Sequence, residues 1–158
     1  APSRLRASAE CSADLAVVAN IPDRYISSPE QRMDIYRRIA LIRTEEEADD
    51  LTDELIDRFG ETPPGVNALI HVALLRGEAG RAGITDISQK QGTLRFTLSD
   101  FDMEKVSALY AREEYKNRLR VEAGSKPCIS LKIKNKNRVI DEARSFAADW
   151  AATAEQST

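Results

Sequence analysis

Hydrophobic residues recur at helical spacing in two consecutive segments near the start of the chain, and each segment follows a helix-start signal. Ser28 can cap the first helix, and Gln31, three residues later, can complete a capping box. Thr44 and Glu47 form the same pair for the second helix, which Gly60 is placed to end. The short link between the helices predicts an antiparallel pair. The expected buried stripes are Met33, Tyr36, Ile39 and Ala40, followed by Ala48, Leu51, Leu55 and Phe59.

A third helix is predicted from residues 62–64, because hydrophobic residues keep the helical period over residues 66–74. Gly77 and Gly80 are expected to interrupt this helix before Gly83, since glycine weakens a helix interior. The spacing G-x-x-G-x-x-G does not make a dinucleotide fingerprint, because these glycines follow a helix and not a strand. A nucleotide site is therefore not expected at this point of the chain.

From residue 84 onward the hydrophobic period changes to two, which predicts β-strands. Residues 84–88 and 93–98 flank a polar tetrapeptide, a pattern typical of a β-hairpin. The order of the predicted elements, helices first and then strands with helices between them, indicates an α+β fold. In this fold an N-terminal antiparallel helix pair and a third helix pack with a small, mostly antiparallel sheet and a C-terminal helix. The other expected elements are strands over 15–18, 118–121 and 129–133, a helix from about residue 102 and a final helix over 136–150.

The length of 158 residues and the hydrophobic share of 42% indicate one folded domain, expected over residues 14–152. Residues 1–13 are interpreted as a flexible linker or an expression remnant, and residues 153–158 as a flexible tail. No apolar run approaches the ~20 residues that a membrane span requires. Cys11 and Cys128 lie far apart and form neither a disulfide framework nor a metal site, so a reducing cytoplasm is the simplest expected location.

The motifs of enzyme sites are absent from the sequence. His71 is the only histidine, so a two-histidine metal set is excluded, and no Cys-x-x-Cys pair occurs. Neither the nucleophile elbow G-x-S-x-G nor the phosphate loop G-x-x-x-x-G-K-[ST] is present. We therefore expect no catalytic residue, no metal ligand and no cofactor. An enzyme of unrecognised type is kept as an additional hypothesis.

Charge is distributed very unevenly, although the formal net charge is only -3. Residues 45–57 hold eight acidic side chains and no basic one. Glu54 is expected on the flank of this helix, three residues before Asp57, so that both can face one partner. A solvated outer face is the usual explanation of such a pattern, but eight like charges repel one another, and a basic partner would relieve this repulsion. The residues expected opposite the buried stripe are Glu46, Asp50, Asp53 and Asp57.

The segment 112–144 has the opposite sign, with ten Lys or Arg against five Asp or Glu. Its basic side chains predict an alternative function, a nucleic-acid-binding module that contacts phosphates. Edge-strand lysines also block unwanted sheet pairing, and no aromatic residues interleave with them to stack bases. The candidate contacts are Lys132, Lys134 and Lys136, on one side of a continuing strand, and Arg138 near its end.

Several stretches are similar to one known family. Residues 19–26 (ANIPDRYI), 31–40 (QRMDIYRRIA) and 54–60 (ELIDRFG), the last followed by Pro63-Pro64, resemble the C-terminal domain of the bacterial transcription-repair coupling factor Mfd. The resemblance covers about residues 14–150 and is specific in the first half, whereas the second half matches mainly in pattern. The Gly77 and Gly80 interruption departs from the usual strongly helical segment of this domain.

The resemblance implies a regulatory, autoinhibitory domain and no ATPase or translocase activity of its own. In that family the full-length protein recognises stalled RNA polymerase, translocates on DNA with ATP and recruits UvrA. The C-terminal domain docks on the UvrB-like N-terminal domain of the same protein, hides the UvrA-binding surface and restrains the motor. Acidic residues of its second helix meet arginines of the partner, and Glu54 and Asp57 match them by motif position.

Overall fold

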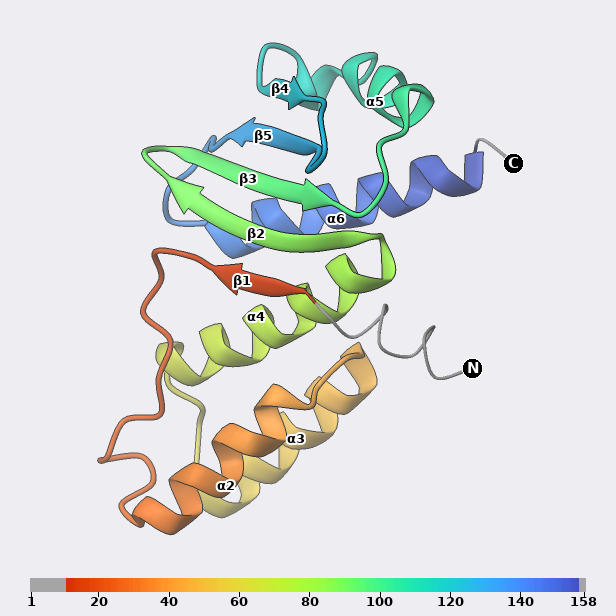
Figure 1. Ribbon diagram of the computed structural model, residues 1–158. Helices are drawn as coiled ribbons and strands as arrows, with labels where there is room; N and C mark the ends of the chain where they lie inside the picture. Colours follow the sequence, from red (N-terminus) through yellow and green to blue (C-terminus); the bar gives the residue numbers. More distant parts are fainter. Residues whose placement is uncertain (1–10, 157–158) are drawn as a thin grey trace.

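A computed structural model describes residues 11–156 (Figure 1), and its α+β architecture confirms the expected fold class. A short strand comes first, three helices follow it, and the other four strands complete a five-stranded sheet, against which a long C-terminal helix packs. The helices are α2 (Pro29–Ala40), α3 (Glu45–Phe59), α4 (Pro64–Arg81), α5 (Met103–Tyr110), the short 3-10 helix η1 (Glu113–Tyr115) and α6 (Val139–Gln156). The strands are β1 (Ser12–Asp14), β2 (Ile84–Lys90), β3 (Thr93–Leu98), β4 (Leu119–Glu122) and β5 (Cys128–Lys132).

The sheet has the strand order β1-β2-β3-β5-β4, in which only the β1–β2 pair is parallel. Strands β2 and β3 form the predicted hairpin, with a tighter turn than the sequence indicated. Gln91 and Gly92 have φ angles of 43° and 80°, the left-handed values of a two-residue type I′ turn. Helix α6 covers one face, where Phe146 stacks on Phe96 of β3 with 4.1 Å between ring centroids.

Helices α2 and α3 form the predicted antiparallel pair, and both N-caps are present. The Ser28 hydroxyl accepts a hydrogen bond from the Gln31 amide, and Thr44 and Glu47 complete a capping box. The buried stripe of α3 is as predicted, whereas that of α2 is confirmed in part, at the predicted Ile39 and at Ile35 and Ile42, which the pattern placed beside it. Ile35 and Ile39 are buried, while Met33 and Ala40 are exposed.

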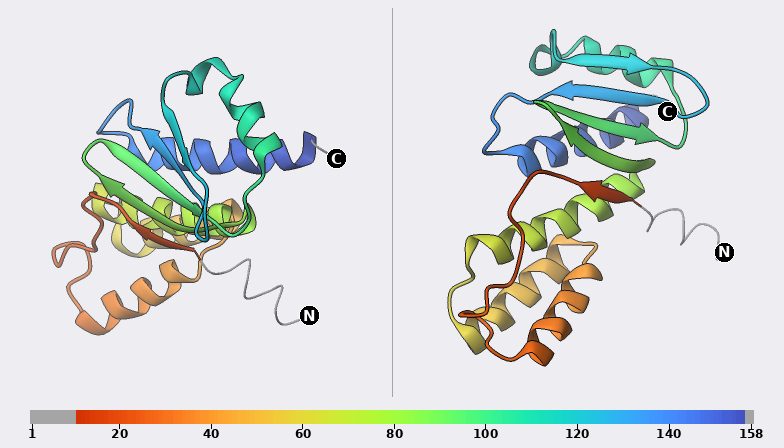
Figure 2. Two further views of the ribbon diagram at one scale, coloured as in Figure 1. Left: turned by 45° about the horizontal axis from the view of Figure 1, so that its top comes forward. Right: turned by 60° about the vertical axis from the view of Figure 1, so that its left-hand side comes forward.

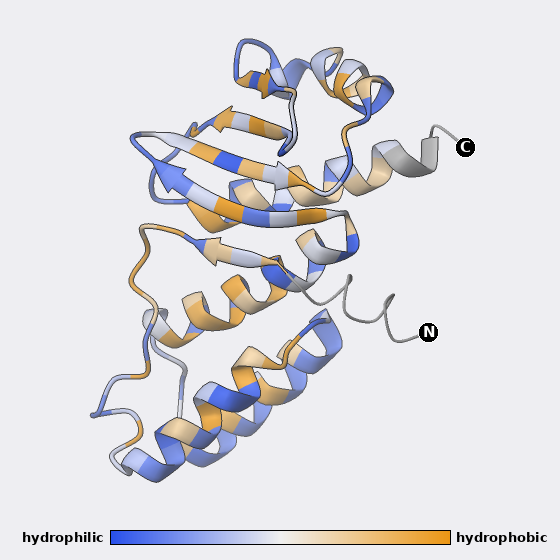
Figure 3. Ribbon diagram, viewed as in Figure 1, coloured by the Kyte–Doolittle hydropathy of each residue, from blue (hydrophilic) through white to orange (hydrophobic). Residues whose placement is uncertain are grey.

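Helix α4 separates two hydrophobic clusters and contributes to both, as Figures 1 and 2 show from different sides. Leu75 and Ala79 pack under the sheet with α6, while Ile70 and Leu74 pack against α2 and α3. Because both sides are covered, α4 is largely apolar in Figure 3, whereas α2 and α3 alternate between hydrophobic and hydrophilic residues. This helix therefore joins the helix pair to the sheet.

The predicted interruption of α4 at Gly77 and Gly80 is wrong. The helix continues through both glycines to Arg81, and Gly83 then turns the chain with a φ of 82°. A Cβ atom at Gly77 would lie 2.8 Å from the backbone oxygen of Arg43, in the link between α2 and α3. The glycine is thus required by close packing of two backbones, and it does not end the helix.

An ionic contact joins the helix pair, α4 and α6. The Arg144 guanidinium of α6 donates to Glu78 of α4 at 2.8 Å and to Glu45 of α3 at 2.6 Å. Arg144 is 22% exposed, so these bonds lie at the partly shielded seam between the two clusters. Because the three residues come from three helices, the contact fixes how the helix pair sits on the rest of the domain.

The ends of the domain differ from the sequence-based boundaries. Strand β1 occupies Ser12–Asp14, so residues 12–13 of the predicted linker belong to the sheet, and residues 15–18 are not a strand. Cys11, just before β1, is buried. Helix α6 continues to Gln156, beyond the boundary at residue 152. The rest of the predicted linker, residues 1–10, and residues 157–158 of the predicted tail lie outside the described residues.

Replacement of Gly77 by alanine tests the close approach at Arg43. Helix propensity alone would stabilise the variant by about 1 kcal/mol. We expect instead that Gly77→Ala lowers the free energy of unfolding by about 1–3 kcal/mol, because the Arg43 backbone must move. Urea unfolding monitored by circular dichroism measures this difference.

The matched control is His71→Ala at an exposed position of the same helix. This variant is expected to change the free energy of unfolding by no more than about 0.5 kcal/mol. If Gly77→Ala were more stable than the unchanged protein, the packing explanation would be wrong.

Candidate interaction surfaces

The outer side of α3 carries the acidic surface, which we define as Glu46, Asp50, Asp53 and Asp57. All four side chains are exposed on the side of α3 opposite Leu51 and Leu55, as the sequence predicted. Within residues 11–156, none of the four carboxylates forms an ion pair. Their negative charge is therefore presented to solvent without a neutralising neighbour in that part of the chain.

Glu54 differs from these four residues, because its carboxylate is bound within the domain. Arg38 of α2 donates two hydrogen bonds to it, at 2.6 and 2.7 Å, and Arg58 donates a third at 2.9 Å. These bonds lower the pKa of the Glu54 carboxyl to about 2. The sequence suggested that Glu54 and Asp57 can both face one partner. In the structure the two carboxylates are not equivalent, because that of Glu54 is already bound to two arginines.

The role of Glu54 in the antiparallel pair could be read only partly from the sequence. The spacing from Glu54 to Arg58 is the i,i+4 spacing of a helical ion pair. The bidentate bond from Arg38 depends on the register between α2 and α3, which no local pattern sets. Consequently Glu54 links the two helices and also holds two guanidinium groups beside the acidic surface.

Apolar side chains accompany the acidic surface. Ile56, between Asp53 and Asp57 in sequence, is 45% exposed, and Leu41, in the link from α2 to α3, is 71% exposed. A shallow groove of about 230 Å³ lies between α2 and α3, with Leu41 and Asp50 among its lining residues. Carboxylates beside exposed aliphatic side chains fit a partner that presents cationic and aliphatic groups together.

The four candidate nucleic-acid contacts do not lie along one strand, as the sequence predicted they would. Strand β5 ends at Lys132, so Lys134, Lys136 and Arg138 lie in the following loop and not on one side of a strand. The chain turns here because the Glu142 carboxylate of α6 accepts hydrogen bonds from the backbone amides of Lys134 and Asn135. The four candidate contacts remain exposed.

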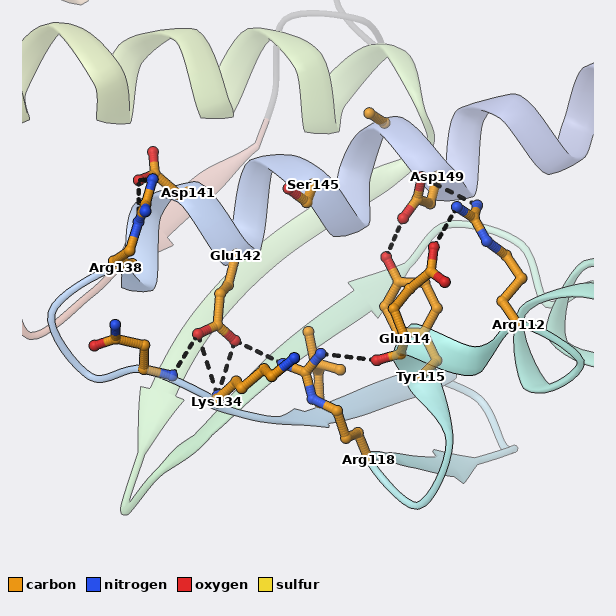
Figure 4. Close-up of a pocket in the computed structure, with 13 residues that line it drawn as sticks. Arg112, Glu114, Tyr115, Arg118, Lys134, Arg138, Asp141, Glu142, Ser145 and Asp149 are labelled. Carbon is orange, nitrogen blue, oxygen red and sulfur yellow. Dashed lines mark hydrogen bonds and ion pairs between the residues drawn. The ribbon is translucent and has the colours of Figure 1, made fainter.

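A pocket of about 590 Å³ lies beside this loop, between η1, β5 and α6 (Figure 4). Apart from Lys134, its charged groups neutralise one another in pairs. Arg118 donates to Glu142 at 2.6 Å, Arg138 pairs with Asp141, and Arg112 pairs with Glu114 and Asp149. Arg138 is therefore already bound to a carboxylate, which weakens its assignment as a phosphate contact.

The described residues contain no group of three or more His, Cys, Asp and Glu side chains that could hold a metal ion. His71 is exposed on α4, and Cys11 and Cys128 are free and buried. Burial raises the pKa of the Cys11 thiol to about 11, so this thiol is a poor nucleophile near neutral pH. In the part of the chain that the structure covers, no helix is both long and apolar enough to cross a membrane.

These features define a small α+β domain whose prominent surfaces are charged. A family model described as the TRCF domain matches residues 15–109, more than half of the chain, and the chain belongs to this family. A solved structure, the crystal structure of the C-terminal domain of transcription-repair coupling factor, has the same fold. It superimposes with a TM-score of 0.76 over 95% of this chain and 98% of that chain, at 21% identity.

Curated relatives confirm the family seen in the sequence. The transcription-repair-coupling factor of Bacillus subtilis is 36% identical over 91 residues, 58% of this chain and 8% of that protein. The corresponding proteins of Escherichia coli and Mycobacterium tuberculosis are 34% and 35% identical over 56% and 65% of this chain, and over 8% and 9% of their own lengths. The chain thus spans less than a tenth of the curated relatives that it matches.

Removing the charge of Glu54 tests its link between α2 and α3. Glu54→Gln is expected to lower the free energy of unfolding by about 1 kcal/mol at neutral pH, a modest value because Glu54 is 36% exposed. Because folding lowers this pKa, the contribution is present above the unfolded pKa and is lost as the pH falls from about 5 toward 2. Urea midpoints across this pH range measure the loss.

Asp57→Asn is the control, since Asp57 is exposed on the same helix and has no ion pair among the described residues. It is expected to change stability by no more than about 0.5 kcal/mol at any of these pH values. Equal losses in both variants would contradict a specific role for Glu54.

Proposed function

We propose that this chain is a regulatory, autoinhibitory domain of a transcription-repair coupling factor. It docks on the UvrB-like N-terminal domain of the same protein, masks the UvrA-binding surface and restrains the DNA translocase until stalled RNA polymerase is engaged. UvrA and RNA polymerase are partners of the full-length protein, which works in the cytoplasm. The fragment itself is not an enzyme and uses no cofactor.

The acidic surface of α3 is the observation that carries this proposal. Its four carboxylates are exposed without ion pairs in the described part of the chain, and Ile56 lies among them. Arginines of a partner can pair with these carboxylates while an aliphatic group covers Ile56. Because partly exposed ion pairs contribute about 1 kcal/mol or less each, several of them make a contact that can be released.

Glu54 has a positioning role in the proposed docking. Its carboxylate is held by Arg38 and Arg58, so a partner arginine meets a preformed cluster and not a mobile side chain. Asp57, one turn further along α3, is free to pair directly. We therefore assign direct pairing with partner arginines to Asp50, Asp53 and Asp57. Glu54 instead holds the Arg38 and Arg58 side chains in place beside them.

The double variant Asp53→Arg with Asp57→Arg tests the docking. Both positions are exposed, so the fold is expected to remain intact while the sign of the surface changes. Binding to the isolated UvrB-like domain is expected to weaken at least about tenfold, because two attractive contacts become repulsive. Isothermal titration of the two domains measures the affinity, which also falls with added salt.

Asp100→Arg with Glu113→Arg is the matched control, because it makes the same change in net charge at exposed positions outside α3. This control is expected to keep its affinity within about threefold, since long-range charge alone is largely screened at physiological salt. Unchanged affinity of the α3 variant, or an equal loss in the control, would reject the acidic surface as the docking site.

A further inference from the structure

The sheet has one face that no helix covers. Helices α4, α5 and α6 pack on the opposite face, where the hydrophobic cluster lies. The alternating side chains of β2, β3, β5 and β4 therefore place a polar set on the uncovered face. Cross-strand pairing puts Lys90, Thr93 and Lys132 in one row, because Thr93 pairs with both lysines. The next row contains Asp14 of β1 together with Ser88, Arg95, Ser130 and Arg120.

Basic side chains gather at the end of this face where the β2–β3 hairpin turns. The backbone amide of Ile133 donates to the Gly92 oxygen at 2.8 Å, which holds the start of the β5–α6 loop beside the hairpin turn. Lys134 and Lys136 in that loop thus belong to the same end of the sheet as the first row. We define the basic end as Lys90, Arg120, Lys132, Lys134 and Lys136.

All five side chains of the basic end are exposed, and none forms an ion pair within residues 11–156. Arg95, in their midst, is instead paired with Glu122 at 3.0 Å. The sequence analysis named Lys132, Lys134 and Lys136 but missed Lys90 and Arg120. These two join the others only through strand pairing, since Lys90 is 42 positions before Lys132.

We propose that the basic end of the sheet binds the phosphate backbone of double-stranded nucleic acid without sequence preference. Five unpaired cations beside the hydroxyls of Ser88, Thr93 and Ser130 offer charge and hydrogen bonds to phosphate oxygens. This surface lies on the sheet and not on α3, so the proposal goes beyond docking through the acidic surface.

The absence of apolar groups distinguishes this surface from a protein-binding one. The large exposed hydrophobic residues of the described chain lie in α2, α3, α5 and the loops at residues 18 and 41, and none lies in β2, β3, β4 or β5. Protein interfaces need an apolar centre, whereas interfaces with DNA are polar and strongly positive. Within residues 11–156, none of the paired strand positions in the two rows of the uncovered face carries an aromatic ring that could stack unpaired bases, which favours a duplex over a single strand.

The test is fluorescence anisotropy with a short labelled DNA duplex of random sequence at low salt. The variant carries Lys90→Gln, Lys132→Gln, Lys134→Gln and Lys136→Gln, all at exposed positions. We expect the dissociation constant to rise at least about tenfold. The slope of log K against log salt is expected to become shallower by about 3.6, because each of the four lost phosphate contacts contributes about 0.9.

The matched control carries Arg24→Gln, Arg37→Gln, Arg81→Gln and Lys126→Gln, which remove the same charge from exposed positions away from the basic end. We expect this control to bind the duplex within about threefold of the unchanged protein, because only contacting cations release counterions. Thermal unfolding of both variants checks that each is folded.

Four outcomes would overturn the proposal. These are no duplex binding by the unchanged protein at low salt, equal losses in the two variants, tighter binding of a single strand of equal length, or displacement of the duplex by polyglutamate as readily as by unlabelled duplex. The last outcome would assign the surface to an acidic protein partner. A loss confined to the lysine variant, with duplex preferred over both competitors, supports the proposal.

Discussion

Helix α4 is buried on two sides, and the rest of the structure depends on this placement. Neither the helix pair nor the sheet has a complete core without it, because Ile70 and Leu74 close one cluster while Leu75 and Ala79 close the other. A helix covered on both sides must be apolar around most of its circumference. The close backbone contact at Gly77 and the Arg144 ion pairs then fix the position of the helix pair.

This arrangement also separates the charges. Acidic side chains on α3 face away from α4, while the basic end belongs to the sheet on the other side of α4. Where opposite charges do approach each other, as in Arg38 with Glu54 or Arg118 with Glu142, they form specific pairs. The charges left over are then of one sign on each surface, and the small net charge of -3 conceals this division.

Local signals in the sequence predicted the elements well, because caps and hydrophobic periods act within a few residues. Thr44 and Glu47 set the start of α3, and the alternation in residues 93–98 set β3. Contacts between distant residues were not predictable. Gly77 looked like a helix breaker because Arg43, its neighbour in space, is 34 positions away. The acidic surface could be predicted from one helix alone, whereas the basic end required the register of four strands.

The separation of charge described for α3 and the sheet has a consequence before any contact forms. A body with negative charge near one end and positive charge near the other has an electric dipole moment, and an external field turns it. As the domain approaches a charged neighbour, this torque acts over about a Debye length, roughly 8 Å at physiological ionic strength. The domain is thereby rotated so that the surface of the matching sign arrives first. Because α4 lies between the acidic surface of α3 and the basic end of the sheet, the charges orient the domain toward a charged neighbour as well as attract it.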